Sequence, residues 1–379
     1  MDEIYLTIFF ILLLLFLLGS GIWVALSMIT VSAIGMMLFT TRPVGDAMAT
    51  TIWGASSSWT LTALPLFVWM GEILFRTKLS ENLFKGLTPW LARLPGGLIH
   101  VNVVGCAIFA AISGSSAATV ATVGKMSIPE LRKRKYPEKL LLGSLAGSGT
   151  LGLLIPPSII LIIYGVTVED SIAKLFMAGI FPGIMIALIF MSYVVIWSIL
   201  NKKLMPRSTE SFTFLRKIKR SKQLLPVIIL IISVIGSIYT GIATATEAAS
   251  LGVVGALILS FFQRTLDWNS FKLSLLGATK TSCMIAFILA GSTFLSLAMG
   301  FTGLPRNLAR KIHKNSNRKK GPFVILNGAL LDVKKYELEL FGEEKKNSSI
   351  SYGALEKATG GILLIDEITE IPLETQSKF

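Results

Sequence analysis

Long apolar runs separated by short polar stretches dominate residues 1–300. In windows of about 19 residues, near the length that a helix needs to cross a bilayer, these runs predict membrane helices. The predicted helices lie near residues 4–18, 22–40, 59–75, 172–200, 224–241, 247–263 and 281–300. Composition agrees, because 53% of the 379 residues are hydrophobic and only 15% are charged. The pattern predicts an all-α integral membrane protein in contact with the lipid bilayer.

Two further apolar regions, 96–134 and 138–167, contain Gly, Ser, Thr and Pro at a density that a lipid-facing helix has little reason to hold. They predict broken helices. The small residues at 112–118 permit a tight reversal, and Pro156-Pro157 removes backbone donors. The freed carbonyls and the nearby hydroxyls can coordinate a hard cation such as sodium. Close helix packing through small residues explains either motif alone equally well.

Taken together, the two broken regions favour a binding site, because each adjoins a long apolar helix and one basic loop separates them. Sodium is the expected metal. The candidate ion- or substrate-binding residues are Ser113, Gly114, Ser115, Ser116, Gly149, Thr150, Gly152, Pro156, Pro157 and Ser158.

Charge predicts the sidedness of the chain. Basic residues cluster in the loops at 125–139 and 202–222, which the positive-inside rule places in the cytoplasm. Region 96–134 then becomes a re-entrant hairpin entered from the cytoplasmic side, and residue 301 falls outside. Because these loops account for most of the net charge of +14, no nucleic-acid partner is expected. Segments 45–56 and 79–94 are either amphipathic interfacial helices or ordinary loops.

Cysteine adds little chemistry to this picture. Cys106 and Cys283 both lie in apolar stretches, so we expect two core residues and neither a disulfide nor a thiolate metal site.

An internal repeat is visible in two short stretches. Residues 77–83 and 302–308 share four of seven letters, and each stretch follows an apolar helix. The same spacing pairs the helix at 22–40 with that at 247–263. The sidedness above makes the paired helices antiparallel, as in the inverted repeats of secondary transporters.

Several stretches in order over residues 1–308 carry a family resemblance. They are Leu64-Pro65-Leu66-Phe67 with Gly71-Glu72, Gly96-Gly97-Leu98 with His100-Val101-Asn102, Ile112-Ser113-Gly114-Ser115, Ile155-Pro156-Pro157-Ser158 with Tyr164-Gly165, and Ala245-Thr246-Glu247-Ala248-Ala249. This part of the chain resembles the large membrane subunit of the tripartite ATP-independent periplasmic (TRAP) transporters, the DctM-like permeases.

The resemblance implies a sodium-coupled symporter in the bacterial inner membrane and not an enzyme. Its partners would be a small membrane subunit and a periplasmic solute-binding protein, and its substrate an organic acid such as a C4-dicarboxylate. Residues 113–116 would form the tip of the first re-entrant hairpin, and 149–158 the unwound stretch beside it. One departure is Leu153, where the family usually has proline.

After Leu308 hydrophobicity falls, and the second repeat stops before its own hairpin. We therefore expect a truncated inverted-repeat transporter over 1–308 and a second domain over 309–379. The stretches 321–327, 339–342 and 360–368 resemble the AAA+ ATPase domain of sigma-54-dependent activators, closest to the NtrX-like regulators, which implies a short α/β fragment. Asp366 and Glu367 would be a vestigial Walker B pair.

The ATPase fragment lacks a phosphate loop of the form GxxxxGK[ST], so no nucleotide is expected to bind. We expect 309–379 to be only partly folded, with strands at 322–327 and 361–366, and not packed against the membrane part. Three functions remain open: a permease that truncation and fusion have made defective, an ATP-dependent sigma-54 regulator with a membrane sensor, and a non-functional fusion product.

Overall fold

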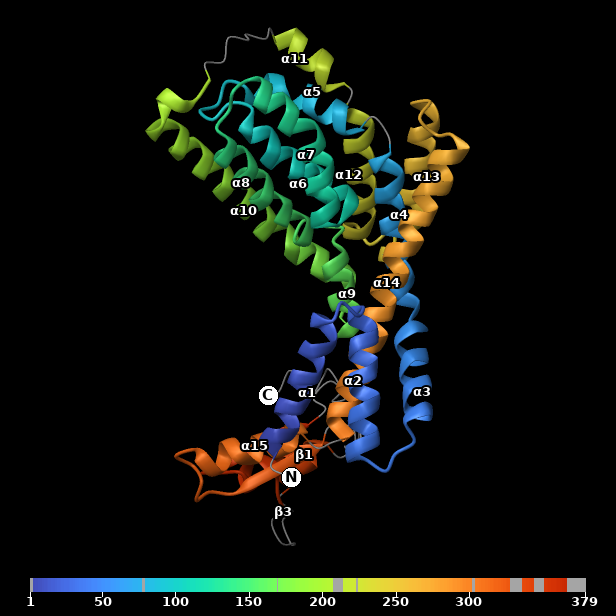
Figure 1. The fold of residues 1–379 in the computed structure, drawn as a ribbon, viewed down its shortest axis with the longest axis vertical. Helices are drawn as coiled ribbons and strands as arrows, with labels where there is room; N and C mark the ends of the chain where they lie inside the picture. The colour runs from blue at the N-terminus through green and yellow to red at the C-terminus, as the bar shows by residue number, and fades with distance from the viewer. Residues whose placement is uncertain are drawn as a thin grey trace. The chain divides into compact units, whose positions relative to one another are not determined.

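The structure is a computed structural model that describes residues 3–76, 79–168, 170–206, 214–222, 224–301, 304–327, 336–343 and 351–366. Helices make up most of it (Figure 1). They form two compact units, a central unit of residues 57–285 and a terminal unit of residues 1–56 with 286–379. The predicted all-α architecture of the membrane part is therefore confirmed.

The central unit is a bundle of helices whose described elements follow one another along the chain. They are η1 (Trp59–Thr62), α4 (Ala63–Phe75), α5 (Leu79–Leu91), α6 (Ile99–Ser113), α7 (Ser116–Lys133), α8 (Glu138–Gly149), η2 (Thr150–Leu153), α9 (Ile159–Thr167), α10 (Ile172–Leu200), η3 (Lys202–Leu204), α11 (Phe214–Ser221), α12 (Leu225–Tyr239), α13 (Ala245–Phe262) and the first half of α14 (Trp268–Phe301). α6 lies at its centre, packed against α4, α5, α7, α8 and α10.

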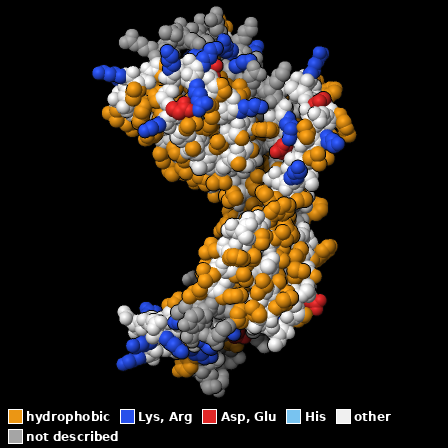
Figure 2. Space-filling view, viewed as in Figure 1, with side chains coloured by type: hydrophobic (Ala, Val, Ile, Leu, Met, Phe, Trp, Pro, Cys, Tyr) orange, Lys and Arg blue, Asp and Glu red, His pale blue; other side chains and the backbone are white. Residues whose placement is uncertain are grey.

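The long helices are apolar all round, as expected of helices in lipid. In α10, Phe181 and Leu200 are about three-quarters exposed, and Figure 2 shows hydrophobic side chains along the outer side of this helix. Among the described residues α10, α13 and α14 are long and apolar enough to cross a membrane, and α3 with η1 and α4 adds a fourth span if that broken pair counts as one. The shorter apolar helices are α1, α2, α6 and α12.

Each predicted membrane segment coincides with a helix, and both predicted interruptions are present. Residues 44–56 and 79–91 are helical as well, so the alternative of ordinary loops is wrong. On α5 the Trp90 indole donates to Ser221 Oγ at 2.7 Å, which ties this helix to α11. Lys and Arg gather over that end of the central unit (Figure 2).

The terminal unit combines the first helices with the end of the chain. Its elements are α1 (Glu3–Gly19), α2 (Val24–Phe39), α3 (Val44–Ser56), the second half of α14, α15 (Leu304–Asn315), β1 (Phe323–Asn327), α16 (Tyr336–Phe341), β2 (Gly342–Glu343), β3 (Ser351–Tyr352), α17 (Ala354–Lys357) and β4 (Ile362–Asp366). Met36 of α2 packs with Phe294 and Ala298 of α14 in a fully buried cluster.

The tail has a small core of its own. β1 and β4 pair in parallel from Phe323–Ile362 to Asn327–Asp366, as the two apolar runs predict, and Leu326, Leu340 and Ala354 are buried beside them. α15 contacts α1. Because α15 begins before residue 308, the expectation that 309–379 would not pack against the membrane part stays a prediction.

The internal repeat extends over several elements. Moved along the chain by the spacing that separates Thr77 from Thr302, α1, α2 and α5 fall within a few residues of α12, α13 and α15, and the stretch from α3 to α4 falls on α14. The order of elements therefore supports the repeat that the seven-letter match indicates. One smaller expectation fails, because Cys283 is exposed on α14 while Cys106 is buried.

Candidate functional site

The first break is a tight reversal between α6 and α7. α6 ends at Ser113 because Gly114 adopts a left-handed conformation with φ of 58°, which glycine tolerates without a side-chain clash. Ser115 caps α7, accepting a hydrogen bond from the Ala118 amide at 3.4 Å. Ser113 Oγ and Thr119 Oγ1 lie 3.0 Å apart inside the turn. The reversal is thus held by hydroxyl groups on both of its arms.

The second break separates α8 from α9. α8 gives way to the 3-10 turn η2 after Gly149, and α9 begins only at Ile159. Pro156 and Pro157 in between are buried and have no amide hydrogen to continue a helix. Ser158 Oγ donates to the Leu153 carbonyl at 2.7 Å and so closes the gap.

The two breaks touch each other. The Ile159 amide, the first of α9, donates to the Gly114 carbonyl at 3.2 Å. A Cβ atom on Gly114 would lie 2.6 Å from the Pro157 carbonyl oxygen, and one on Gly152 would lie 2.8 Å from the Ser116 nitrogen. Backbone therefore lies against backbone, which explains why glycine occupies both positions.

The candidate residues differ in their exposure. Seven are buried, namely Ser113, Gly114, Gly149, Gly152, Pro156, Pro157 and Ser158. Ser115 and Ser116 are half-buried, and Ser116 Oγ is shielded from solvent with no hydrogen-bond partner in the described part of the chain. Thr150 is exposed, and its hydroxyl donates to the Gly147 carbonyl at 2.7 Å. The structure thus brings all of these residues to one place except the Thr150 side chain.

A cavity of about 320 Å³ opens beside the reversal. Ser113 and Ser115 line it, together with two polar residues that sequence reasoning missed, Glu72 of α4 and Thr281 of α14. The remaining lining residues are Val68, Gly71, Phe75, Ala117, Ala118, Ala121 and Ile159. A carboxylate inside an apolar run is a signal that could have identified Glu72, since ionisable groups in membrane helices are usually functional.

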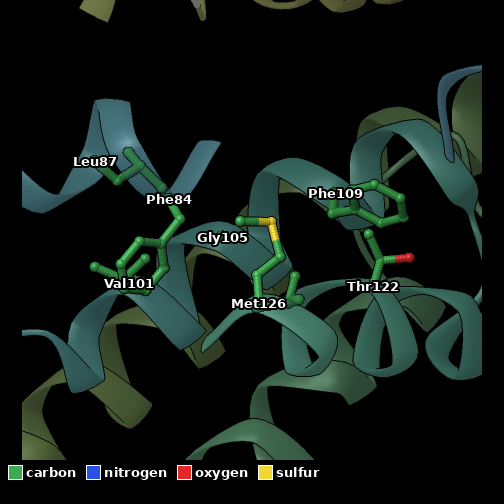
Figure 3. Close-up of a pocket in the computed structure, with 8 residues that line it drawn as sticks. Phe84, Leu87, Val101, Gly105, Phe109, Thr122 and Met126 are labelled. Atoms are coloured by element: carbon green, nitrogen blue, oxygen red, sulfur yellow. The ribbon is translucent and has the colours of Figure 1, made fainter. Parts of the chain in front are cut away.

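A second cavity, between α5, α6 and α7, is too small and too apolar to compete (Figure 3). It measures about 10 Å³, at the lower limit for one water molecule. Its lining residues are Phe84, Leu87, Val101, Gly105, Phe109, Thr122, Val123 and Met126. Thr122 supplies the one hydroxyl among them, so a charged or polar ligand would find too few partners there.

At the other end of α7 an ion pair joins the end of this helix to the start of α8. Arg132 donates to the Glu138 carboxylate, with Nε 3.0 Å from Oε1. This hydrogen bond holds the pKa of Glu138 below its ordinary value. No three His, Cys, Asp or Glu side chains gather as a metal cluster in the described ranges.

The predicted Walker B pair is only partly visible. Asp366 ends β4 opposite Asn327 of β1, while Glu367 lies outside the described residues. An acidic residue at the end of an apolar strand fits the pattern, but the sequence offers no phosphate loop to accompany it. The ATPase interpretation stays a prediction.

Comparison with known proteins identifies the chain's relatives. The family described as "Tripartite ATP-independent periplasmic transporter, DctM component" matches residues 9–332, beyond the boundary at residue 308 predicted for the second domain. The C4-dicarboxylate TRAP transporter large permease protein DctM of Pseudomonas aeruginosa is 32% identical over 73% of this chain and 64% of its own length. Its counterpart in Rhodobacter capsulatus is 31% identical over 80% and 71%.

The sialic acid TRAP transporter large permease protein SiaM of Vibrio cholerae is 33% identical over 77% of this chain and 68% of its own length. The chain thus spans between about three-fifths and three-quarters of these relatives. The match covers all of the central unit and both helix breaks. The chain belongs to the DctM family of TRAP transporter large permeases.

Proposed function

We propose that this chain is the membrane permease subunit of a sodium-coupled secondary transporter for an organic acid. The observation that carries the proposal is the contact between the two breaks, where the Ile159 amide donates to the Gly114 carbonyl. Unwound backbone beside a tight reversal is how secondary transporters expose oxygen ligands within a bundle of apolar helices.

The donor set fits sodium, a hard cation that prefers oxygen ligands. The hairpin offers the Ser113, Ser115 and Ser116 hydroxyls, and Ser116 Oγ has no other partner among the described residues. Bound sodium would supply positive charge to oxygens on both breaks. The chain's own part is to hold these oxygens together through the glycine contacts at 114 and 152.

The substrate class rests on the relatives. The names of the matched permeases mention C4-dicarboxylate, sialic acid and isethionate, which are all acids but differ in shape. We propose an organic acid, delivered by a periplasmic solute-binding protein and carried with a small membrane subunit in the bacterial inner membrane.

Sodium binding to the full chain in lipid nanodiscs tests the proposal. We expect Ser113→Ala and Ser116→Ala each to weaken binding about tenfold, the effect of losing one good ligand. Thr150→Val is a weaker test, because the Thr150 side chain is exposed and its hydroxyl donates to the Gly147 carbonyl. Ser233→Ala is the matched control, because that exposed serine bonds only within α12. Equal sodium affinity in all variants would rule out the hairpin site.

The second candidate, an ATP-dependent regulator, rests on Asp366 at the end of β4. Without a phosphate loop we expect no magnesium-dependent ATP binding or hydrolysis by the full chain. Turnover that Glu367→Gln abolishes would favour the ATPase interpretation over a remnant.

A further inference from the structure

We infer that Glu72 is the charged ligand of the cation that enters the cavity beside the hairpin, and that Arg76 competes with the cation for this carboxylate. The inference rests on the proposed sodium coupling and adds to it a residue outside both helix breaks.

α4 lies between the hairpin and α14, and glycine permits the close approach on both sides. A Cβ on Gly71 would lie 3.0 Å from Ser113 Cα, and one on Gly277 would lie 2.7 Å from Glu72 Oε2. About one turn before Glu72 in α4, Trp69 Nε1 donates to Ser274 Oγ of α14 at 3.3 Å. The Glu72 carboxylate is thus placed at the junction of three elements, where the cavity opens.

The polar lining of the cavity consists of oxygen-bearing side chains. Glu72 supplies a carboxylate, while Ser113, Ser115 and Thr281 supply hydroxyls. No Lys, Arg or His is among the lining residues. The Glu72 carboxylate attracts a cation and repels the carboxylate of an organic acid. The charge of Glu72 therefore favours the ion over the substrate at this position.

Arg76 occupies the other side of the same carboxylate. Its Nη2 lies 3.3 Å from Glu72 Oε2 and 3.2 Å from the Leu273 carbonyl oxygen of α14. Charge-assisted hydrogen bonds of this kind usually measure about 2.7–2.9 Å, so the ion pair is loose. Because Leu273 offers a second acceptor, the guanidinium keeps a partner when Glu72 turns toward a cation.

This competition predicts effects of opposite sign from the two members of one ion pair. Glu72→Gln removes the charge that attracts sodium and should weaken binding about tenfold or more. Arg76→Gln removes the competitor and should tighten binding by about threefold to tenfold. If the pair served structure alone, both substitutions would break the same contact and would weaken binding together.

The experiment measures binding of radioactive sodium to the purified full chain in nanodiscs, with potassium as the competing ion. Glu72→Asp keeps the charge and should bind more tightly than Glu72→Gln. Should Glu72→Gln not fold, the sign of the Arg76→Gln effect decides alone. Two results would overturn the role of Glu72 and leave the hairpin site in place. One is weaker sodium binding in Arg76→Gln. The other is unchanged sodium binding in Glu72→Gln while Ser113→Ala binds sodium more weakly. Absence of sodium binding in the unsubstituted chain overturns both proposals.

Discussion

The break between α6 and α7 is built with glycine, whereas the break between α8 and α9 is built with proline. Gly114 turns the chain back on itself through a left-handed conformation, while Pro156 and Pro157 interrupt a chain that continues onward. The first break leaves the Gly114 carbonyl without an intrahelical donor, and the second leaves the Ile159 amide, the first of α9, without an intrahelical acceptor. The Ile159 amide donates to the Gly114 carbonyl, so each break satisfies a backbone group of the other.

The largest expected effect tests the glycine side of this comparison. Gly114→Ala should lower stability by about 2–5 kcal/mol, because a left-handed alanine costs about 1–2 kcal/mol and its Cβ would meet the Pro157 oxygen. Thermal unfolding in detergent measures it. Gly143→Ala is the control, since nothing lies within 4 Å of a Cβ there and the helix should gain up to about 1 kcal/mol. Equal stability in both variants would contradict the close contact.

A smaller effect is expected at Gly152. The backbone there is not left-handed, so a side chain would cause a steric clash but no backbone strain. A Cβ there would lie 2.8 Å from the Ser116 nitrogen, so Gly152→Ala should cost about 1–3 kcal/mol and push the second break away from the hairpin. Sodium affinity should fall with it. A variant that loses stability but keeps sodium affinity would show that the hairpin alone forms the ion site.

The smallest effect concerns the loop between the breaks. The Arg132 hydrogen bond lowers the pKa of Glu138 in the folded chain, so the pair stabilises the fold above the unfolded pKa and loses this contribution as pH falls through the folded pKa. In the unsubstituted chain, the melting temperature should fall as the pH drops below the ordinary pKa of glutamate. In Glu138→Gln this fall should be smaller, because the substituted side chain does not titrate. Because both side chains are exposed, the change should be slight; a large change would mean that the loop holds the hairpin in place.

The membrane helices were predictable because the bilayer demands a simple pattern. A run of apolar residues such as 172–200 has few alternatives to a helix when no water is present to satisfy its backbone, and α10 covers the same residues. The breaks were predictable for the complementary reason, since Gly114 and Pro156-Pro157 each exclude a continuous helix. The structure of the tail was harder to predict. A short apolar run such as 323–327 forms a strand only when a second strand pairs with it, and the run itself does not specify that partner.

The sequence by itself determined the lengths of the apolar helices, the places where they break and the family to which the chain belongs. Only the tertiary structure decided which oxygens face one another. Glu72 and Ser113 are far apart in the chain, and no local pattern relates them. They line one cavity because glycines at 71 and 277 let α4 approach both the hairpin and α14. Thr150 shows the converse, since its hydroxyl suits a cation but is directed to the Gly147 carbonyl of its own helix.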